Sequence, residues 1–113
     1  MKFEDTEVWK RAARLSASIY KEVAELKDYG FKDQITRSDL SIPSNIAEGF
    51  GRMTDKDKSN FLGYARGSCA ELRTQIYIGR EIGYIDQNIS KSWISETNEI
   101  TAMLTGLIKY LKT

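Results

Sequence analysis

The sequence predicts an all-α protein: an antiparallel up-down four-helix bundle whose second helix is kinked at Pro43. Four segments carry apolar residues at three- and four-residue steps, which places those residues on one helical face in each segment. No segment alternates between apolar and polar residues with the period of two that a strand requires. Because short connections join the four segments, consecutive helices are expected to pack as antiparallel neighbours. The 113 residues predict a single domain over residues 1–113.

The first predicted helix runs from about Asp5 to Lys27. Its apolar stripe consists of Val8, Ala12, Leu15, Ile19, Val23 and Leu26. The sequence Asp-Tyr-Gly at positions 28–30 is expected to end this helix, with Gly30 as the residue that follows the C-cap.

The second predicted helix runs from about Phe31 to Phe50 and contains the only proline of the chain. A proline inside a helix removes one hydrogen bond and clashes with the carbonyl four residues earlier, here that of Asp39. The apolar stripe nevertheless stays in phase across Pro43. This continuity favours one kinked helix, and two helices separated near Ser41 are the alternative.

The third and fourth predicted helices run from about Asp55 to Gly83 and from about Asp86 to Leu111. Thr54 and Asp86 are the expected N-caps. The third helix has a heptad-like seam of Leu62, Ala65, Cys69, Leu72, Ile76 and Gly79. The fourth has a stripe of Ile89, Trp93, Ile100, Met103, Leu107 and Leu111.

The composition excludes several kinds of site. The chain has no histidine, so it lacks the usual general base, the usual zinc ligand and every histidine-containing catalytic triad. Its single cysteine, Cys69, excludes an internal disulfide and fits a reducing compartment. The absence of a signal segment and of a long apolar stretch predicts a cytoplasmic protein with no membrane partner. We expect no cofactor, no metal and no enzymatic activity.

The stretch SIPSNIAEGFGR, at positions 41–52, combines the proline with polar residues and two glycines. It lacks the Gly-Lys-Ser/Thr ending of a phosphate-binding loop and follows a helix rather than a strand. Ser44 and Glu48 share a helical face, but glutamate is a poor base for a serine hydroxyl and no third residue orients the pair. A small enzyme that uses carboxylates or Ser44 is therefore the disfavoured alternative.

The favoured interpretation of the same stretch is structural. Nearby Ser or Asn side chains could satisfy the carbonyl that the proline leaves without a donor. Gly49 and Gly51 are expected to end the helix. The predicted structural motif consists of Pro43, Ser44, Asn45, Glu48 and Gly49.

This stretch also carries a family resemblance. Together with FLGYARGSCAEL, GREIGYI and the opening FEDTEVWKRAARL, it resembles the four-helix-bundle proteins encoded in intervening sequences of bacterial 23S rRNA genes. Thr6 stands where that family usually has leucine, and Asp39 where it usually has a small apolar residue. The resemblance implies a bundle that assembles into a ring, a homo-pentamer. A relative of the family, the accessory protein of diversity-generating retroelements, binds nucleic acid and a reverse transcriptase, which implies RNA, DNA or a protein as partners here.

A basic stripe on the third predicted helix supports nucleic-acid binding independently. Positions 56, 59, 63, 66, 70, 73, 77 and 80 follow each other at three- and four-residue steps. No acidic residue lies three or four positions from the three arginines of this face, so the usual ion pairs within one helix are missing. The candidate residues for nucleic-acid binding or for a subunit interface are Lys56, Arg66, Arg73, Tyr77 and Arg80.

The alternative is that these arginines pair with acids of another helix or subunit, such as Glu22, Glu48 or Glu71. With 17 basic and 16 acidic residues, the net charge is only +1, which favours pairing over binding to nucleic acid. The sequence therefore predicts a non-enzymatic, oligomeric interaction protein, with RNA or DNA as the candidate ligand of the stripe.

Overall fold

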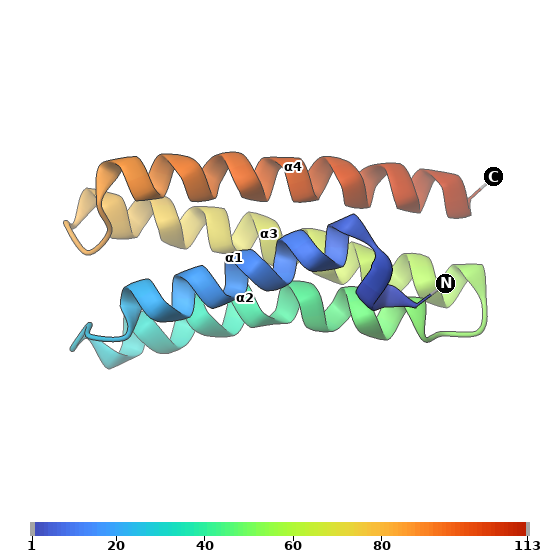
Figure 1. Ribbon diagram of the computed structural model, residues 1–113, viewed down its shortest axis with the longest axis horizontal. Coiled ribbons are helices and arrows are strands. Elements are labelled where there is room, and N and C mark those ends of the chain that lie inside the picture. The colour runs from blue at the N-terminus through green and yellow to red at the C-terminus, as the bar shows by residue number, and fades with distance from the viewer. Residues whose placement is uncertain (1, 113) are drawn as a thin grey trace.

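Four helices joined by short connections make up the described chain, residues 2–112 of a computed structural model. A 3₁₀ turn, η1 (Phe3–Asp5), precedes the helices α1 (Glu7–Val23), α2 (Tyr29–Phe50), α3 (Asp55–Glu81) and α4 (Gln87–Leu111) (Figure 1). The bundle measures 44 × 21 × 20 Å. The predicted all-α four-helix bundle is confirmed, and residues 2–112 contain no strand. None of the helices in this range combines the length and hydrophobicity that a membrane crossing requires.

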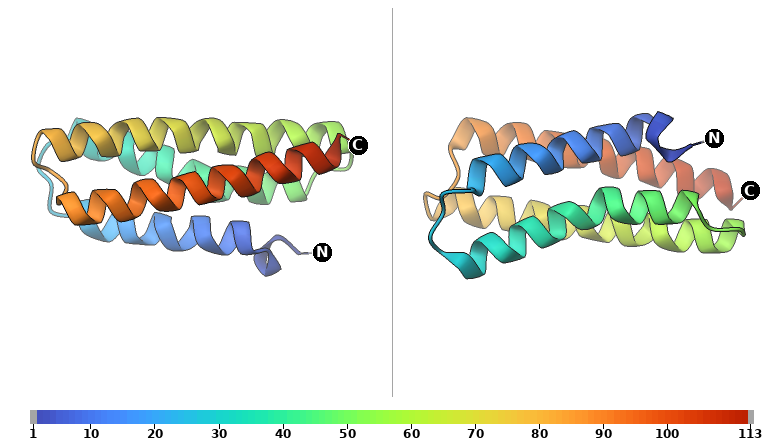
Figure 2. Two further views of the ribbon diagram at one scale, coloured as in Figure 1. Left: turned by 90° about the horizontal axis from the view of Figure 1, so that it is seen from above. Right: turned by 60° about the horizontal axis from the view of Figure 1, so that its bottom comes forward.

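The connections lie at alternate ends of the bundle. The α1–α2 and α3–α4 connections share the left end in Figure 1, and the α2–α3 connection lies at the right end. The two views of Figure 2 show the same arrangement. Among neighbouring helices, α2 and α3 make the most contacts and α1 and α4 the fewest. Helices α1 and α4 therefore approach each other less closely than the other neighbouring pairs of helices.

The helix starts follow from their capping side chains. Thr6 accepts a hydrogen bond from the Trp9 N–H at 3.3 Å, so α1 begins at Glu7, two residues later than predicted, and it ends at Val23. Asp28 accepts from the Phe31 N–H at 3.0 Å, and this N-cap starts α2 at Tyr29. Gly30 consequently lies inside α2, and the prediction that it ends the first helix is wrong.

Helix α2 continues across Pro43, so the alternative of two helices broken near Ser41 is wrong; the kink itself stays a prediction. Asn45 donates to the Ser41 carbonyl at 2.8 Å, and Ser41 donates to the Ser38 carbonyl at 2.9 Å. Neither side chain reaches the carbonyl of Asp39, which is the one that lost its donor. The prediction that a Ser or Asn side chain satisfies the carbonyl freed by Pro43 is therefore not met by these two bonds.

Gly49 serves close packing between helices rather than helix termination. A Cβ atom at this position would lie 3.2 Å from the Phe61 Cβ and 3.3 Å from the Lys58 carbonyl oxygen. These distances are shorter than ordinary van der Waals contacts, so the absence of a side chain at Gly49 favours the close approach of α2 and α3. Of the two glycines predicted to end α2, only Gly51 does so, as its C-cap.

Replacement of glycine by alanine is expected to have opposite effects on stability at Gly79 and at Gly106. Gly79→Ala would place a Cβ 2.6 Å from the Ile85 Cδ1 and 2.9 Å from the Phe31 Cζ. We expect this overpacking to lower the free energy of unfolding by about 1–3 kcal/mol. Gly106→Ala meets no atom within 4 Å, so the gain in helix propensity should raise the same quantity by about 1 kcal/mol. Urea unfolding of both variants checks this pair, and equal effects of the two substitutions would contradict it.

Candidate interaction surface on the third helix

The basic stripe, Lys56, Arg66, Arg73, Tyr77 and Arg80, lies along α3 outside the buried seam of that helix. Thr54 fixes the start of α3 by accepting a hydrogen bond from the Asp57 N–H at 3.1 Å. From Lys56 to Arg80 the stripe covers about 36 Å at 1.5 Å per residue. Lys56, Arg66 and Tyr77 are exposed, and Arg73 and Arg80 are half-buried. The structure therefore brings the predicted residues onto one continuous helix.

Two arginines of the basic stripe lean over α4. Arg66 donates from Nη1 to the Thr105 Oγ1 at 3.3 Å, and Arg73 donates from Nη1 to the Thr101 Oγ1 at 3.0 Å. Each of these bonds uses one of the five N–H donors of a guanidinium. The two threonines fix the direction of the guanidinium groups while leaving most of their donors unused. The sequence analysis missed Thr101 and Thr105, although their four-residue spacing places them on one face of the fourth helix.

None of the basic residues in the stripe has an acidic partner within residues 2–112. The ion pairs of this range lie elsewhere and involve Arg11, Arg14, Arg37 and Arg52. Glu48, one of the acids considered as a partner, pairs with Arg52 at 3.4 Å. Pairing within the bundle is therefore the wrong explanation for the stripe, and its charge is left uncompensated in the single chain.

The aromatic residue of the stripe contacts its last arginine. The Arg80 guanidinium carbon lies 5.3 Å from the centroid of the Tyr77 ring, at the distance of a cation–π interaction. The Tyr77 side chain remains 47% exposed, so part of its ring is open to a further planar group. Arginine and tyrosine together offer the two contacts that nucleic-acid backbones and bases use: charge for phosphates and a flat face for stacking.

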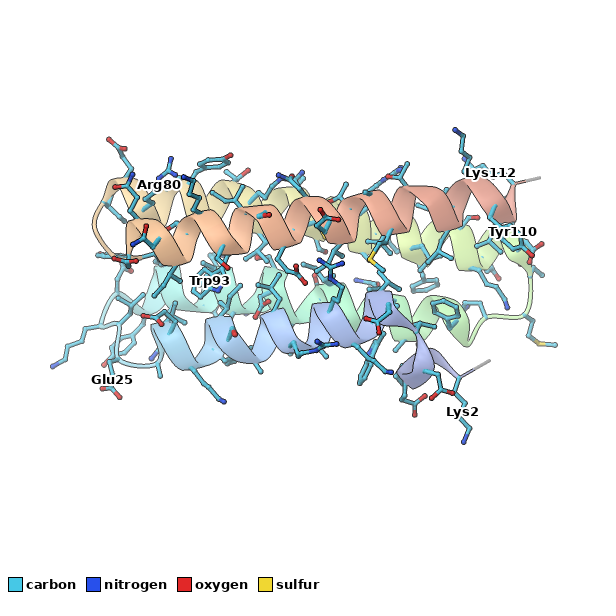
Figure 3. All side chains as sticks on the ribbon, turned by 45° about the horizontal axis from the view of Figure 1, so that its top comes forward. Lys2, Glu25, Arg80, Trp93, Tyr110 and Lys112 are labelled. Carbon is cyan, nitrogen blue, oxygen red and sulfur yellow. The ribbon has the colours of Figure 1, made fainter. Side chains whose placement is uncertain are left out.

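Helix α4 extends the basic surface at the end of the bundle where the chain terminates. Lys109 and Lys112 follow Thr105 at steps of four and three residues, so they share its helical face, and both are exposed. Figure 3 shows Arg80 and Lys112 on the same side of the bundle, whereas Glu25 and Lys2 lie on the opposite side. Arg80 and Lys112 lie at opposite ends of this side in Figure 3. Sequence reasoning missed both lysines, because they belong to a different segment from the stripe.

Two serines of α2 that precede the predicted structural motif, Ser38 and Ser41, hydrogen-bond to side chains of α3. The Ser41 and Ser68 hydroxyl groups are hydrogen-bonded to each other at 2.6 Å, and Ser38 donates to the Gln75 Oε1. Ser44 is exposed beside Pro43, whereas Glu48 turns toward Arg52. No hydrogen bond joins Ser44 to Glu48 within residues 2–112, because Glu48 pairs with Arg52 instead.

Two buried titratable groups lie outside the basic surface. Burial raises the pKa of Cys69 to about 11, which keeps its thiol protonated and unreactive at neutral pH. Burial also raises the pKa of Asp39 to about 7, and a weak contact with the Ser16 hydroxyl, which lies outside hydrogen-bond geometry, opposes only part of this shift. Asp39 is 0% exposed, and neither of its carboxylate oxygens has a hydrogen-bond partner within the described range. The carboxyl group of Asp39, four residues before Pro43, thus lies in the core rather than on the surface.

Comparison with known proteins identifies the family and agrees with the fold. A family model described as 23S rRNA-intervening sequence protein matches residues 4–106. A crystal structure of a protein of unknown function from the S23 ribosomal protein family of Bacteroides thetaiotaomicron is 27% identical, with a TM-score of 0.84. The match covers 90% of this chain and 98% of that one. No curated protein matches the chain.

Proposed function

The chain belongs to the family of 23S rRNA-intervening sequence proteins, and from this membership we propose that it is a non-enzymatic, homo-oligomeric protein that binds nucleic acid through the basic stripe of α3. The ligand group is the phosphate backbone of RNA or DNA. The guanidinium groups would contact phosphate oxygens, and Tyr77 would offer a stacking face for a base.

The observation that carries the proposal is the unpaired state of the arginines. Arg66 and Arg73 are aimed by neutral threonine hydroxyls, and no carboxylate of residues 2–112 lies within ion-pair distance of either. These arginines form no ion pair that would stabilise the bundle. Their repeated positive charges along one helix suit the repeated negative charges of a phosphate backbone. A net charge of +1 does not oppose a local surface of this kind, because binding depends on the field at the surface.

The oligomer matters for the strength of binding. Each subunit offers only a few phosphate contacts, and a single set of such contacts binds weakly. A homo-oligomer repeats the stripe on every subunit, so one long strand can engage several stripes and gain affinity through effective concentration. Short ligands should therefore bind much more weakly than long ones of the same composition.

A binding titration at several salt concentrations tests the proposal. We expect single-stranded RNA and duplex DNA to bind, with the logarithm of the association constant falling steeply between 50 and 200 mM salt because each phosphate contact releases counterions. The slope should be about 0.9 per contact on duplex DNA and about 0.7 on single strands. Absence of binding to both ligands at 50 mM salt would rule out the proposed ligand.

A further inference from the structure

We propose that the groove at the end of the bundle where α1 begins and where α2 and α4 end binds a small aromatic cation, an arylalkyl ammonium compound. No residue of α3 lines this groove, so the inference goes beyond the proposed function and depends neither on nucleic acid nor on an assembly of subunits. Three helices form the walls, acids at the start of α1 supply the charge, and a glycine of α4 leaves space for the ligand.

The walls of the groove are apolar. They include Val8 of α1, Phe50 of α2, and Met103 and Leu107 of α4. The groove lies beside α1 and α4, the neighbouring helices that make the fewest contacts. In Figure 1 these helix ends meet at the right, beside both ends of the chain. The volume of about 580 Å³ lies within the range of about 300–1,000 Å³ that is typical of sites for small ligands.

The groove is short along the helix axes. Its α4 residues, from Met103 to Leu107, cover about 6 Å, and the side next to α1 consists of residues 5–8. A helix of another protein would need anchor sites over two turns or more, so these dimensions favour a small molecule. Phe50 and Met103 favour an aromatic ligand, because both aromatic rings and thioether sulfurs make favourable contacts with a ring.

Gly106 leaves space on the α4 wall. It lines the groove, and a Cβ atom at this position would meet no atom within 4 Å. A glycine inside a helix destabilises that helix relative to alanine. Neither close packing between helices nor a positive φ explains the glycine here. The missing side chain instead keeps open a space that a bound ring can fill.

The polar groups of the groove select a cation. Asp5 and Glu7 line it and are both exposed. Thr6 also lines it, but its hydroxyl is already hydrogen-bonded to the backbone on both sides. Asp5 has no ion-pair partner within residues 2–112, and Glu7 has only Arg14 at 4.0 Å. Because that pair is exposed and long, it is weak and leaves Glu7 able to contact a ligand.

The base that contacts the groove does not neutralise these acids. Arg11 donates to the Met103 Sδ at 4.0 Å, but two hydrogen bonds of 2.9 and 2.7 Å pair its guanidinium with Glu96. The pKa of Arg11 is raised by this contact with Glu96 and further by the charges of Glu99 and Glu7. Three carboxylates thus act on one guanidinium, and the resulting field favours a cation over an anion.

Three probes with the same ring test the class of ligand: naphthylethylamine, the neutral naphthylethanol and the anionic naphthylacetate. In fluorescence anisotropy at low salt, we expect the amine to bind about fivefold more tightly than the alcohol, and the anion to bind more weakly than the alcohol. The preference for the amine should disappear when Asp5→Asn is combined with Glu7→Gln. Asp55→Asn with Asp57→Asn is the matched control, because it removes two acids from the first turn of α3. Equal affinity of wild type for the amine and the anion would overturn the proposed class.

Gly106→Leu tests the place of binding. Leucine is a strong helix former and would fill the open space, so binding of naphthylethylamine should fall at least about tenfold while the helix content in circular dichroism stays unchanged. Gly67→Leu should bind as wild type does, because Gly67 is exposed on α3 and a Cβ there also meets no atom within 4 Å. Unchanged binding in Gly106→Leu would overturn the site.

Failure of wild type to bind naphthylethylamine at millimolar concentration would also overturn the proposal. If Gly106→Leu then lowers the mass measured by light scattering, a second copy of the chain covers the groove in place of a small ligand. Preference for the amine, lost in Gly106→Leu and kept in Gly67→Leu, supports the site.

Discussion

The free energy of unfolding of the wild-type chain is expected to fall by about 3 kcal/mol between pH 5 and pH 8, and Asp39→Asn should abolish this fall. Asp39 is fully buried in α2, and its carboxylate has no hydrogen-bond partner within residues 2–112. Desolvation penalises the charged form, which raises the pKa from 3.8 to about 7 in the folded chain. No charged neighbour contributes to this shift, so no buried cation compensates the carboxylate.

The sign of the effect follows from proton binding. Between pH 4 and pH 7 the folded chain holds a proton on Asp39 that the unfolded chain has released, so the free energy of unfolding falls as the pH rises. Above pH 7 both states are ionised and the loss is complete. The lowered pKa values of Asp28 and Glu96 affect stability in the opposite direction, but only at lower pH. Measurements between pH 5 and pH 8 therefore isolate Asp39.

Urea unfolding at several pH values measures this effect. Asp33→Asn is the matched control, because Asp33 lies on the same helix and its side chain is 60% exposed. The control should keep the pH dependence of wild type, whereas Asp39→Asn should flatten it and should be the more stable protein at pH 8. A wild-type stability that is constant from pH 5 to pH 8 would show that the carboxylate is hydrated or paired in solution.

Periodicity and caps account for how much of the fold could be predicted. The stripes on the third and fourth helices fixed those elements to within two residues, because Thr54 and Asp86 cap them as expected. The connection between α1 and α2 was misplaced because Gly30 was taken as a helix end. The carboxylate of Asp28 instead starts the next helix, and a good N-cap tolerates a glycine in the first turn.

The candidate surface could be predicted only in part, since half of it belongs to another helix. Spacing alone aligned Arg66, Arg73 and Arg80 on one face of α3. It could not show that Thr101 and Thr105 aim two of them, because contacts between helices depend on how the bundle is packed. Nor could it place Asp39, whose full burial contradicts the general rule that lone carboxylates stay at the surface.

Simultaneous replacement of Arg66, Arg73 and Arg80 by alanine is expected to weaken binding to nucleic acid by about 10²- to 10³-fold at 0.1 M salt. If each arginine contacts one phosphate, the salt dependence on duplex DNA should also become shallower by about 2.7. The loss should be similar for all sequences, because phosphate contacts carry little sequence information. Thr101 and Thr105 each lose the hydrogen bond donated by an arginine in this variant. Both are partly or fully exposed, so water can replace that donor and the bundle should remain folded.

A second triple variant separates local charge from total charge. Replacement of Arg14, Lys27 and Arg37 by alanine removes the same three charges from other exposed positions, so the net charge changes equally from +1. Only loss of the arginine stripe should abolish tight binding, if the field at α3 rather than the total charge attracts the ligand. The remaining explanation is that the three arginines hold subunits together. In that case the assembly should dissociate when they are replaced, and the mass measured on the same samples would show it. A stripe variant that stays assembled and binds as tightly as wild type would show that the arginines contact neither phosphate nor a second subunit.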